Sequence, residues 1–341
     1  MFKRVLPVLT LCFLSLPAWS QTEAPVAPPA APALENAEAA PQTVLVSGAR
    51  PGPGLWKVSK DDHVLWVFGT YSPLPAKMEW HSRNVEKVIA GSQEYLKPPG
   101  SVASVGMMKS LTVLPFMIGF KKNPDGAVLK DVLPPDVYAR WQPLKQKYFG
   151  DDDGIERERP NFVASELYSR AMRDAGFFGG GNQVLKKIDS LVEKHKVKVT
   201  DARYKVEIKD PGKALRTFKK SPLDDVPCLA KTMASLETDV EVMRARANAW
   251  AVGELDEIRK LNFDDRTTAC DQALTTSSVA KNQPELQNMR ETAAVMWIAA
   301  AEKALATNPS TFTVVQIRDI LDPKGVIAAL QRKGYTVEPP K

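Results

Sequence analysis

Short apolar runs near both ends of the chain have the composition of β-strands. The first two cover residues 55–58 and 64–68 and are separated by the polar segment Lys60-Asp61-Asp62. Runs rich in valine and aromatic residues, with a turn of this composition between them, are typical of a β-hairpin. A buried strand is expected at 314–317 and a closing strand at 335–337. The two ends of the chain are therefore predicted to contribute strands to one sheet.

The middle of the chain has apolar residues at helical spacing. The motif Pro134-Pro135-Asp136 predicts the start of one helix, because proline is tolerated in the first turn, where its missing N–H would have no partner. The run Gly179-Gly180-Gly181 is interpreted as a flexible connection, because it lacks the GxGxxG pattern and the preceding strand of a dinucleotide-binding loop. The other helices are expected at 83–90, 160–175, 184–195, 228–258, 287–306 and 325–333, and further strands at 94–96 and 198–204.

These elements predict an α/β fold. A mixed central sheet is built from the N- and C-terminal strands, and a helical subdomain, at about residues 130–306, is inserted between them. The loop at 69–73 follows the second strand at its carboxyl end, where open α/β sheets usually bind ligands. The candidate chemistry is therefore expected at that end of the sheet.

The first fifty residues are expected to lie outside the folded domain of residues 51–341. Residues 1–20 have a charged start, an apolar core and a small-residue cleavage site, which predicts an export signal peptide. Residues 21–50 are rich in alanine and proline and are predicted to be a disordered linker. A lipid anchor on Cys12 is disfavoured by the bulky residue before it. No later segment is long and apolar enough to span a membrane, so the protein is expected in the periplasm or secreted.

Charge gives no indication of a nucleic-acid partner. The chain has a formal net charge of +6, of which two positive charges leave with the signal, and its basic residues are mixed with acidic ones. Short runs such as Lys219-Lys220 are typical of solvated faces. Weak attraction to anionic lipid or to envelope polysaccharide stays open.

The cysteines predict a disulfide. After loss of the signal only Cys228 and Cys270 remain, and two cysteines in an exported chain favour a bridge over a metal site. The bridge would close a loop of roughly 40 residues and contribute on the order of 4 kcal/mol by restricting the unfolded chain. The alternative is a pair of buried free thiols.

Two signatures at the chain ends resemble those of a known family. The first is the strand that ends in Gly69-Thr70-Tyr71-Ser72, and the second runs from Thr311 through Asp319 to Val337. Together they resemble the N- and C-terminal signatures of the TraB/GumN family, which is related to the TIKI metalloproteases. The resemblance covers roughly residues 50–340 and implies a metal-dependent hydrolase with peptidase-like activity.

The metal-ligand positions of that family are substituted in this chain. The family's strands end in Gly-Thr-x-His and Gly-x-x-His, and here Ser72 and Asp319 occupy the histidine positions and Gln316 the second glycine. The family's acidic residue after a middle strand corresponds to Lys97 or Pro98. Serine is a poor ligand for a transition metal, and a lysine ammonium repels a cation. The resemblance thus implies a divergent member without the metal-ligand histidines.

The three histidines of the chain offer no replacement ligands. His63, His81 and His195 occur at no metal-binding spacing and lie near no cysteine in the sequence. A catalytic zinc site generally has three protein ligands. No cofactor is therefore expected, and no divalent metal is expected to bind.

Ser72 has a second interpretation as a nucleophile. Lys97 could serve as its base if it were desolvated. However, no GxSxG elbow surrounds Ser72, and Pro73 removes a backbone N–H of the kind that often completes an oxyanion hole. An ordinary loop hydroxyl is the favoured interpretation.

A third point of resemblance is the helix that contains Arg246 and Trp250. It matches the family's Arg-Asn-x-x-Trp except at Ala247, and the two side chains share a helix face. The resemblance implies an arginine that orients an anion. The favoured alternative is an arginine stacked on the tryptophan and paired with a carboxylate. Tyr71 and Trp80 either line a cleft for a sugar or peptide or belong to the core.

The sequence favours a catalytically inactive descendant over an enzyme. An intact scaffold with an altered centre predicts a mixed-charge pocket for a polar or anionic ligand or an envelope protein, formed by Ser72, Lys97, Arg246 and Asp319. No catalytic residue is assigned. Two alternatives stay open: a hydrolase that acts through other residues, and an assembly factor for envelope polysaccharide. An enzyme requires convergent ionisable groups in a closed pocket, whereas an assembly factor would show an exposed apolar patch.

Overall fold

The computed structural model describes residues 52–104, 113–177, 180–208, 210–260, 266–281 and 284–340. The chain divides into a unit Met1–Ser47 and a unit Gly48–Lys341. Only the second unit is described below. The predicted signal and linker lie outside the described residues and stay predictions.

The strands form one six-stranded sheet and one two-stranded sheet. The main sheet has the order β5-β3-β7-β2-β1-β8, and β4 pairs with β6 in the second sheet. The strands are β1 Leu55–Lys60, β2 His63–Thr70, β3 Glu94–Leu96, β4 Ser101–Ser104, β5 Lys198–Thr200, β6 Tyr204–Glu207, β7 Ser310–Gln316 and β8 Thr336–Glu338.

The helices follow the predicted positions closely at both ends of the chain and subdivide the middle. They are α1 Arg83–Ala90, α3 Leu129–Val132, α4 Pro135–Phe149, α5 Pro160–Asp174, α6 Gly180–Lys194, α7 Pro211–Lys220, α8 Val226–Thr238, α9 Val240–Val252, α10 Asp256–Arg259, α11 Arg266–Thr275, α12 Ser278–Lys281, α13 Pro284–Gln287, α14 Met289–Thr307, α15 Ile317–Leu321 and α16 Val326–Arg332.

The mixed α/β fold predicted from the sequence is confirmed. β1 and β2 form the expected antiparallel hairpin, and Asp61 in its turn has a positive φ of 54°. β7, from the C-terminal end of the chain, lies between β2 and β3 and runs parallel to both. β8 closes the sheet by pairing antiparallel to β1. The N- and C-terminal strands therefore build one sheet.

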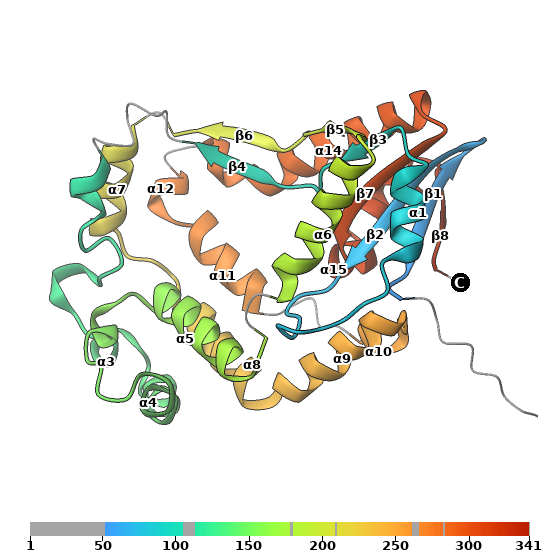
Figure 1. Cartoon of the computed structure of the whole chain (residues 1–341). Coiled ribbons are helices and arrows are strands. Elements are labelled where there is room, and N and C mark those ends of the chain that lie inside the picture. The colour runs from blue at the N-terminus through green and yellow to red at the C-terminus, as the bar shows by residue number, and fades with distance from the viewer. Residues whose placement is uncertain are drawn as a thin grey trace, which may run out of the picture. The chain divides into compact units, whose positions relative to one another are not determined.

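Helices cover both faces of the main sheet. Consecutive residues of β7 are buried, which requires cover on both sides of the strand. Figure 1 shows α1 and α6 in front of the sheet and α14 behind it. α1 and α6 pack against each other, while α14 packs against β2, β3 and β7. The apolar residues of these helices and of the sheet form one buried core.

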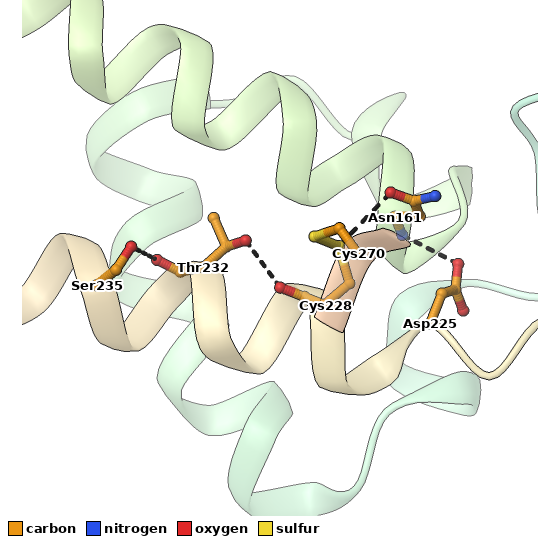
Figure 2. Close-up of a disulfide and its surroundings, with 6 residues drawn as sticks. All are labelled: Asn161, Asp225, Cys228, Thr232, Ser235 and Cys270. Atoms are coloured by element: carbon orange, nitrogen blue, oxygen red, sulfur yellow. Dashed lines mark hydrogen bonds between the residues drawn. A yellow bond between two sulfur atoms is a disulfide. The ribbon is translucent and has the colours of Figure 1, made fainter. Parts of the chain in front are cut away.

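A second apolar core lies among the helices of the middle of the chain. It gathers buried side chains of α3, α4, α5 and α8. Cys228 of α8 and Cys270 of α11 are at disulfide-bonding distance, with their Sγ atoms 1.98 Å apart (Figure 2). Beside them, the Thr232 hydroxyl donates to the Cys228 carbonyl, and the Asn161 backbone N–H donates to Asp225. The cysteine pair thus ties two helices together at the edge of this core.

The single strand expected at 198–204 is wrong. Two short strands, β5 and β6, occupy this region and belong to different sheets. Asp201 causes the break, because its carboxylate accepts hydrogen bonds from the backbone N–H of Arg203 at 3.1 Å and from its Nε at 2.8 Å. Such local side-chain bonds favour turns over strand pairing.

The long helix expected at 228–258 is three helices. α8 ends at Thr238, and α9 ends at Val252, before Gly253, whose φ of 78° is the left-handed conformation that commonly terminates a helix. The expected flexible connection at 179–181 is also revised, because Gly180 begins α6.

The cysteine pair gives a first testable prediction. Intact-mass analysis after alkylation without reductant should show neither Cys228 nor Cys270 modified, and both modified after reduction. Replacing both by serine should lower the free energy of unfolding by about 2–4 kcal/mol. Alkylation of both residues without reductant would contradict the bridge.

Candidate functional site

The carboxyl ends of the parallel strands meet at one edge of the main sheet, here called the carboxyl edge. β2, β7, β3 and β5 run in the same direction, so the segments that follow them all leave from this edge. Ser72 follows β2, Lys97 follows β3, and Asp319 lies in α15 directly after β7. Open α/β sheets bind ligands at such an edge.

Two buried indoles fix helices at the carboxyl edge. Trp250 of α9 donates from Nε1 to the Gly69 carbonyl at 2.7 Å, and Trp297 of α14 donates to the Lys97 carbonyl at 2.9 Å. Both indoles are almost fully buried. A buried carbonyl left without a partner where a strand ends costs about 1–3 kcal/mol. The indoles therefore satisfy the strand ends and hold α9 and α14 against them.

Close contacts at two glycines bring α15 to the end of β2. A Cβ atom on Gly69 would collide with the Trp56 ring and lie 3.2 Å from Cδ1 of Ile320. A Cβ atom on Gly325 would collide with the backbone carbonyl of Asp319. The segment that carries Asp319 therefore packs directly against the strand that Trp250 also contacts.

Arg246 reaches the carboxyl edge from α9, one turn before Trp250. Its Nη2 donates to the Lys260 carbonyl at 3.0 Å. Burial raises the pKa of Tyr71 to about 12, and the charge of Arg246 and a hydrogen bond from it offset part of that rise. Among the described residues, Arg246 makes no cation–π contact with Trp250 and no ion pair with a carboxylate. The result is a neutral tyrosine hydroxyl beside a guanidinium.

Asp319 faces arginines. Its Oδ1 lies 3.7 Å from Nη2 of Arg290, and its side chain is one-third exposed. Burial raises the pKa of Asp319, and the positive charges of Arg290 and Arg318 offset only part of the rise. The carboxylate of Asp319 is therefore partly buried and lies beside two positively charged side chains.

Ser72 and Lys97 make no contact of this kind with Arg246 or Asp319 among the described residues. The Ser72 side chain is exposed in the loop after β2. The charge of Lys97 acts on Asp201, whose pKa is held well below its usual range mainly by hydrogen bonds from Arg203. No hydrogen bond or ion pair of the described residues joins Ser72, Lys97, Arg246 and Asp319 to one another. The fold brings the four to one edge, where each has its own neighbours.

Sequence reasoning missed Arg290 and Arg318. Arg290 lies seven residues before Trp297, so the two share a face of α14, and the indole that caps Lys97 directs Arg290 along the same edge. The spacing is visible in the sequence, but no signal there indicates that α14 brings Trp297 to the end of β3 and Arg290 to Asp319.

A groove opens beside the loop that follows Ser72. It has a volume of about 760 Å³, and its lining is mainly apolar. One wall is the segment 75–79, and another is a face of α9. The charged or polar groups at the groove are Lys77, Glu79, Arg244 and Asn248. Trp80, which ends this wall, stacks on Phe68 with ring centroids 5.4 Å apart and belongs to the packing around Trp250.

The described residues do not fit a bound divalent metal. Nowhere in the part of the chain that the structure describes do three or more His, Cys, Asp or Glu side chains gather as ligands. Asp319 faces cations. His63 hydrogen-bonds the Leu305 carbonyl and His195 lies against Glu86, so these two histidines are engaged at separate places.

The fold and this edge define a mixed α/β protein whose candidate site lies at the ends of parallel strands. The model of the TraB/PrgY/gumN family matches residues 54–339, and the chain belongs to that family. The resemblance of the two end signatures is thereby confirmed. No curated protein and no solved structure matches the chain. Within the described residues, no helix has the length and apolar character needed to cross a membrane.

The indole at Gly69 gives a second prediction. Trp250→Phe should lower the free energy of unfolding by about 1–3 kcal/mol, because it leaves the buried Gly69 carbonyl without a donor. Chemical denaturation measures the change. Trp80→Phe, in the same aromatic cluster but without a hydrogen bond, is the matched control and should cost clearly less. Equal costs would contradict the role of the hydrogen bond.

The pKa of Asp319 gives a third prediction. Because folding raises this pKa, the ionised carboxylate disfavours the folded state above the folded pKa, and the penalty disappears below the unfolded pKa of about 3.9. Asp319→Asn should therefore raise Tm at pH 7 and leave it unchanged at pH 3. Asp62→Asn, at a turn position whose side chain is 94% exposed, is the control and should not raise Tm at pH 7. A lower Tm of Asp319→Asn at pH 7 would contradict the assignment.

Proposed function

We propose that this chain is an exported, non-catalytic member of the TraB/PrgY/gumN family that binds an anionic ligand at the carboxyl edge. The observation that carries the proposal is that Arg290 and Arg318 lie beside Asp319, with Asp322 as the further charged group that acts on it, and that no cluster of metal ligands occurs among the described residues. Export rests on the predicted signal at 1–20 and on the Cys228–Cys270 pair, which an oxidising compartment keeps bonded.

The side chains at this edge suit a carboxylate or a phosphate. A guanidinium offers parallel N–H donors that match either anion, and such charge-assisted bonds are the strong ones. The guanidinium of Arg246 has more N–H donors than its bonds to the Lys260 carbonyl and to Tyr71 use, and the Arg290 side chain is two-thirds exposed. The exposed Ser72 adds a hydroxyl, and the buried Tyr71 hydroxyl hydrogen-bonds the Arg246 guanidinium.

The groove along 75–79 and α9 accommodates the rest of the ligand. Its volume of about 760 Å³ falls in the range of small-molecule sites, about 300–1,000 Å³. Because the wall begins three residues after Ser72, a ligand anchored at the carboxyl edge by its anionic group can extend into it. The apolar lining favours a ligand whose extended part is apolar.

One observation favours the alternative of an active hydrolase. A partly buried carboxyl with a raised pKa is typical of a general acid or base. Acid–base catalysis also needs the reacting partner within hydrogen-bond reach of such a group. The charged groups that act on Asp319 are Arg290, Arg318 and Asp322, and the arginines exchange no proton near neutral pH. The arrangement therefore supports anion binding better than catalysis.

Anion binding gives the fourth prediction. At matched ionic strength, inorganic phosphate and citrate should raise Tm, and neutral sugars should not. Calorimetric titration should show that Arg246→Gln and Arg290→Gln each weaken citrate binding by about tenfold or more, because a charge-assisted hydrogen bond is worth about 1.5–3 kcal/mol.

The matched control is Arg332→Gln. Arg332 is also exposed and also donates to a backbone carbonyl, that of Pro323, but among the described residues it has no contact with Tyr71, Arg246 or Asp319. It should bind citrate like the unmodified protein. Equal losses in all three variants would contradict the site, and so would the absence of any response to the two anions.

A further inference from the structure

A short apolar segment between β4 and α3 projects its largest side chains into solvent. Residues 113–117 form a helical turn, and a tight turn follows to 121. Leu114, Met117 and Ile118 are 62%, 42% and 77% exposed. Their spacing of three and four residues places them on one face. This face, formed by Leu114, Met117 and Ile118, is called the apolar tip below.

The other face of the same segment is anchored. The guanidinium of Arg216 on α7 lies 4.8 Å from the centroid of the Phe116 ring. Phe120 packs edge-on against Phe162, with ring centroids 5.2 Å apart. The segment thus directs its aromatic residues inward and its aliphatic residues outward. The packed aromatic side chains therefore hold the segment in place while the apolar tip stays exposed.

Two lysine pairs are held together next to the apolar tip. Arg159, whose side chain is almost fully buried, donates from Nε to the Lys122 carbonyl at 3.1 Å and from Nη2 to the Lys219 carbonyl at 3.0 Å. One guanidinium therefore fixes Lys121-Lys122, directly after the tip, beside Lys219-Lys220 at the end of α7. These four lysines are called the basic rim.

The charge of the basic rim is poorly compensated. None of its lysines forms an ion pair with a described residue, although Lys121 contacts the Phe162 ring face at 6.0 Å. The charges of Lys121 and Lys122 act on the carboxyl of Glu158, whose pKa is nevertheless raised by its own burial. Like charges held side by side repel one another. An anionic partner would relieve that repulsion.

We propose that the apolar tip and the basic rim dock together on an anionic phospholipid bilayer. Aliphatic side chains on a supported turn can enter the boundary between headgroups and acyl chains, and adjacent lysines meet the headgroup charge with their apolar stems extended along the surface. The protein would then lie on a membrane without crossing it. This inference does not rest on the proposed anion-binding function, because the carboxyl edge contributes none of these residues.

The geometry favours a bilayer over a protein partner. A protein interface of ordinary stability buries a broad patch, whereas the tip consists of three aliphatic side chains on one turn. Apolar residues ringed by lysines are the composition of interfacial membrane anchors. An acidic protein partner would use the lysines but would not need the exposed Leu114 and Ile118.

Vesicle co-sedimentation tests the proposal. The protein, purified after export has removed residues 1–20, is mixed with vesicles of equal parts phosphatidylglycerol and phosphatidylcholine, or of phosphatidylcholine alone. Binding should require phosphatidylglycerol and weaken with added salt. The double variant Leu114→Ser/Ile118→Ser should weaken binding by about tenfold or more. Lys121→Gln/Lys122→Gln should weaken it to a similar degree.

Matched controls come from equally exposed positions elsewhere. Val295→Ser removes an aliphatic side chain that is 66% exposed on α14. Lys186→Gln/Lys187→Gln removes an exposed lysine pair of α6. Both should bind vesicles like the unmodified protein, and all variants should keep its Tm within a few degrees.

Three results would overturn the proposal: no binding to anionic vesicles, equal losses in the control variants, or loss only with the lysine variant. The last result would indicate electrostatic contact without insertion, as with an acidic protein.

Discussion

The arrangement of this protein depends on how its parallel strands end. A strand that stops inside a folded protein leaves carbonyls that must find donors. Here two indole N–H groups supply them, Trp250 at Gly69 and Trp297 at Lys97. Each bond also fixes a helix at the edge, α9 at β2 and α14 at β3. The charged side chains of those helices, Arg246 and Arg290, owe their positions to the same two contacts.

Scaffold and chemistry can therefore change independently in this fold. The indole contacts and the close packing at Gly69 define the edge whatever side chains line it. Under the proposed function, a serine at one strand end and an aspartate beside two arginines at another make the edge suited to an anion, where the family resemblance implies a cation. The indole hydrogen bonds and the packing at Gly69 do not involve these substituted side chains. Family membership and the proposed non-catalytic role are thus physically compatible.

The sequence predicted more of the fold than of the candidate site. Strand and helix periodicity located the hairpin, β7 and α16, because these elements bury continuous apolar faces. It failed at Asp201, where a local side-chain bond ended a strand, and at Gly253, where one residue in a left-handed conformation ended a helix. The pairing of Asp319 with Arg290 joins distant elements through tertiary packing. No local pattern encodes such a pair, and only the packing of α14 reveals it.

The most direct test of the account is the metal content of the protein, purified without chelator or affinity tag and measured by elemental mass spectrometry. We expect far less than one zinc, manganese or cobalt per chain, and no rise in Tm when any of them is added. A nearly stoichiometric metal that raises Tm would contradict the account, because it would require ligands that the described residues around Asp319 do not supply.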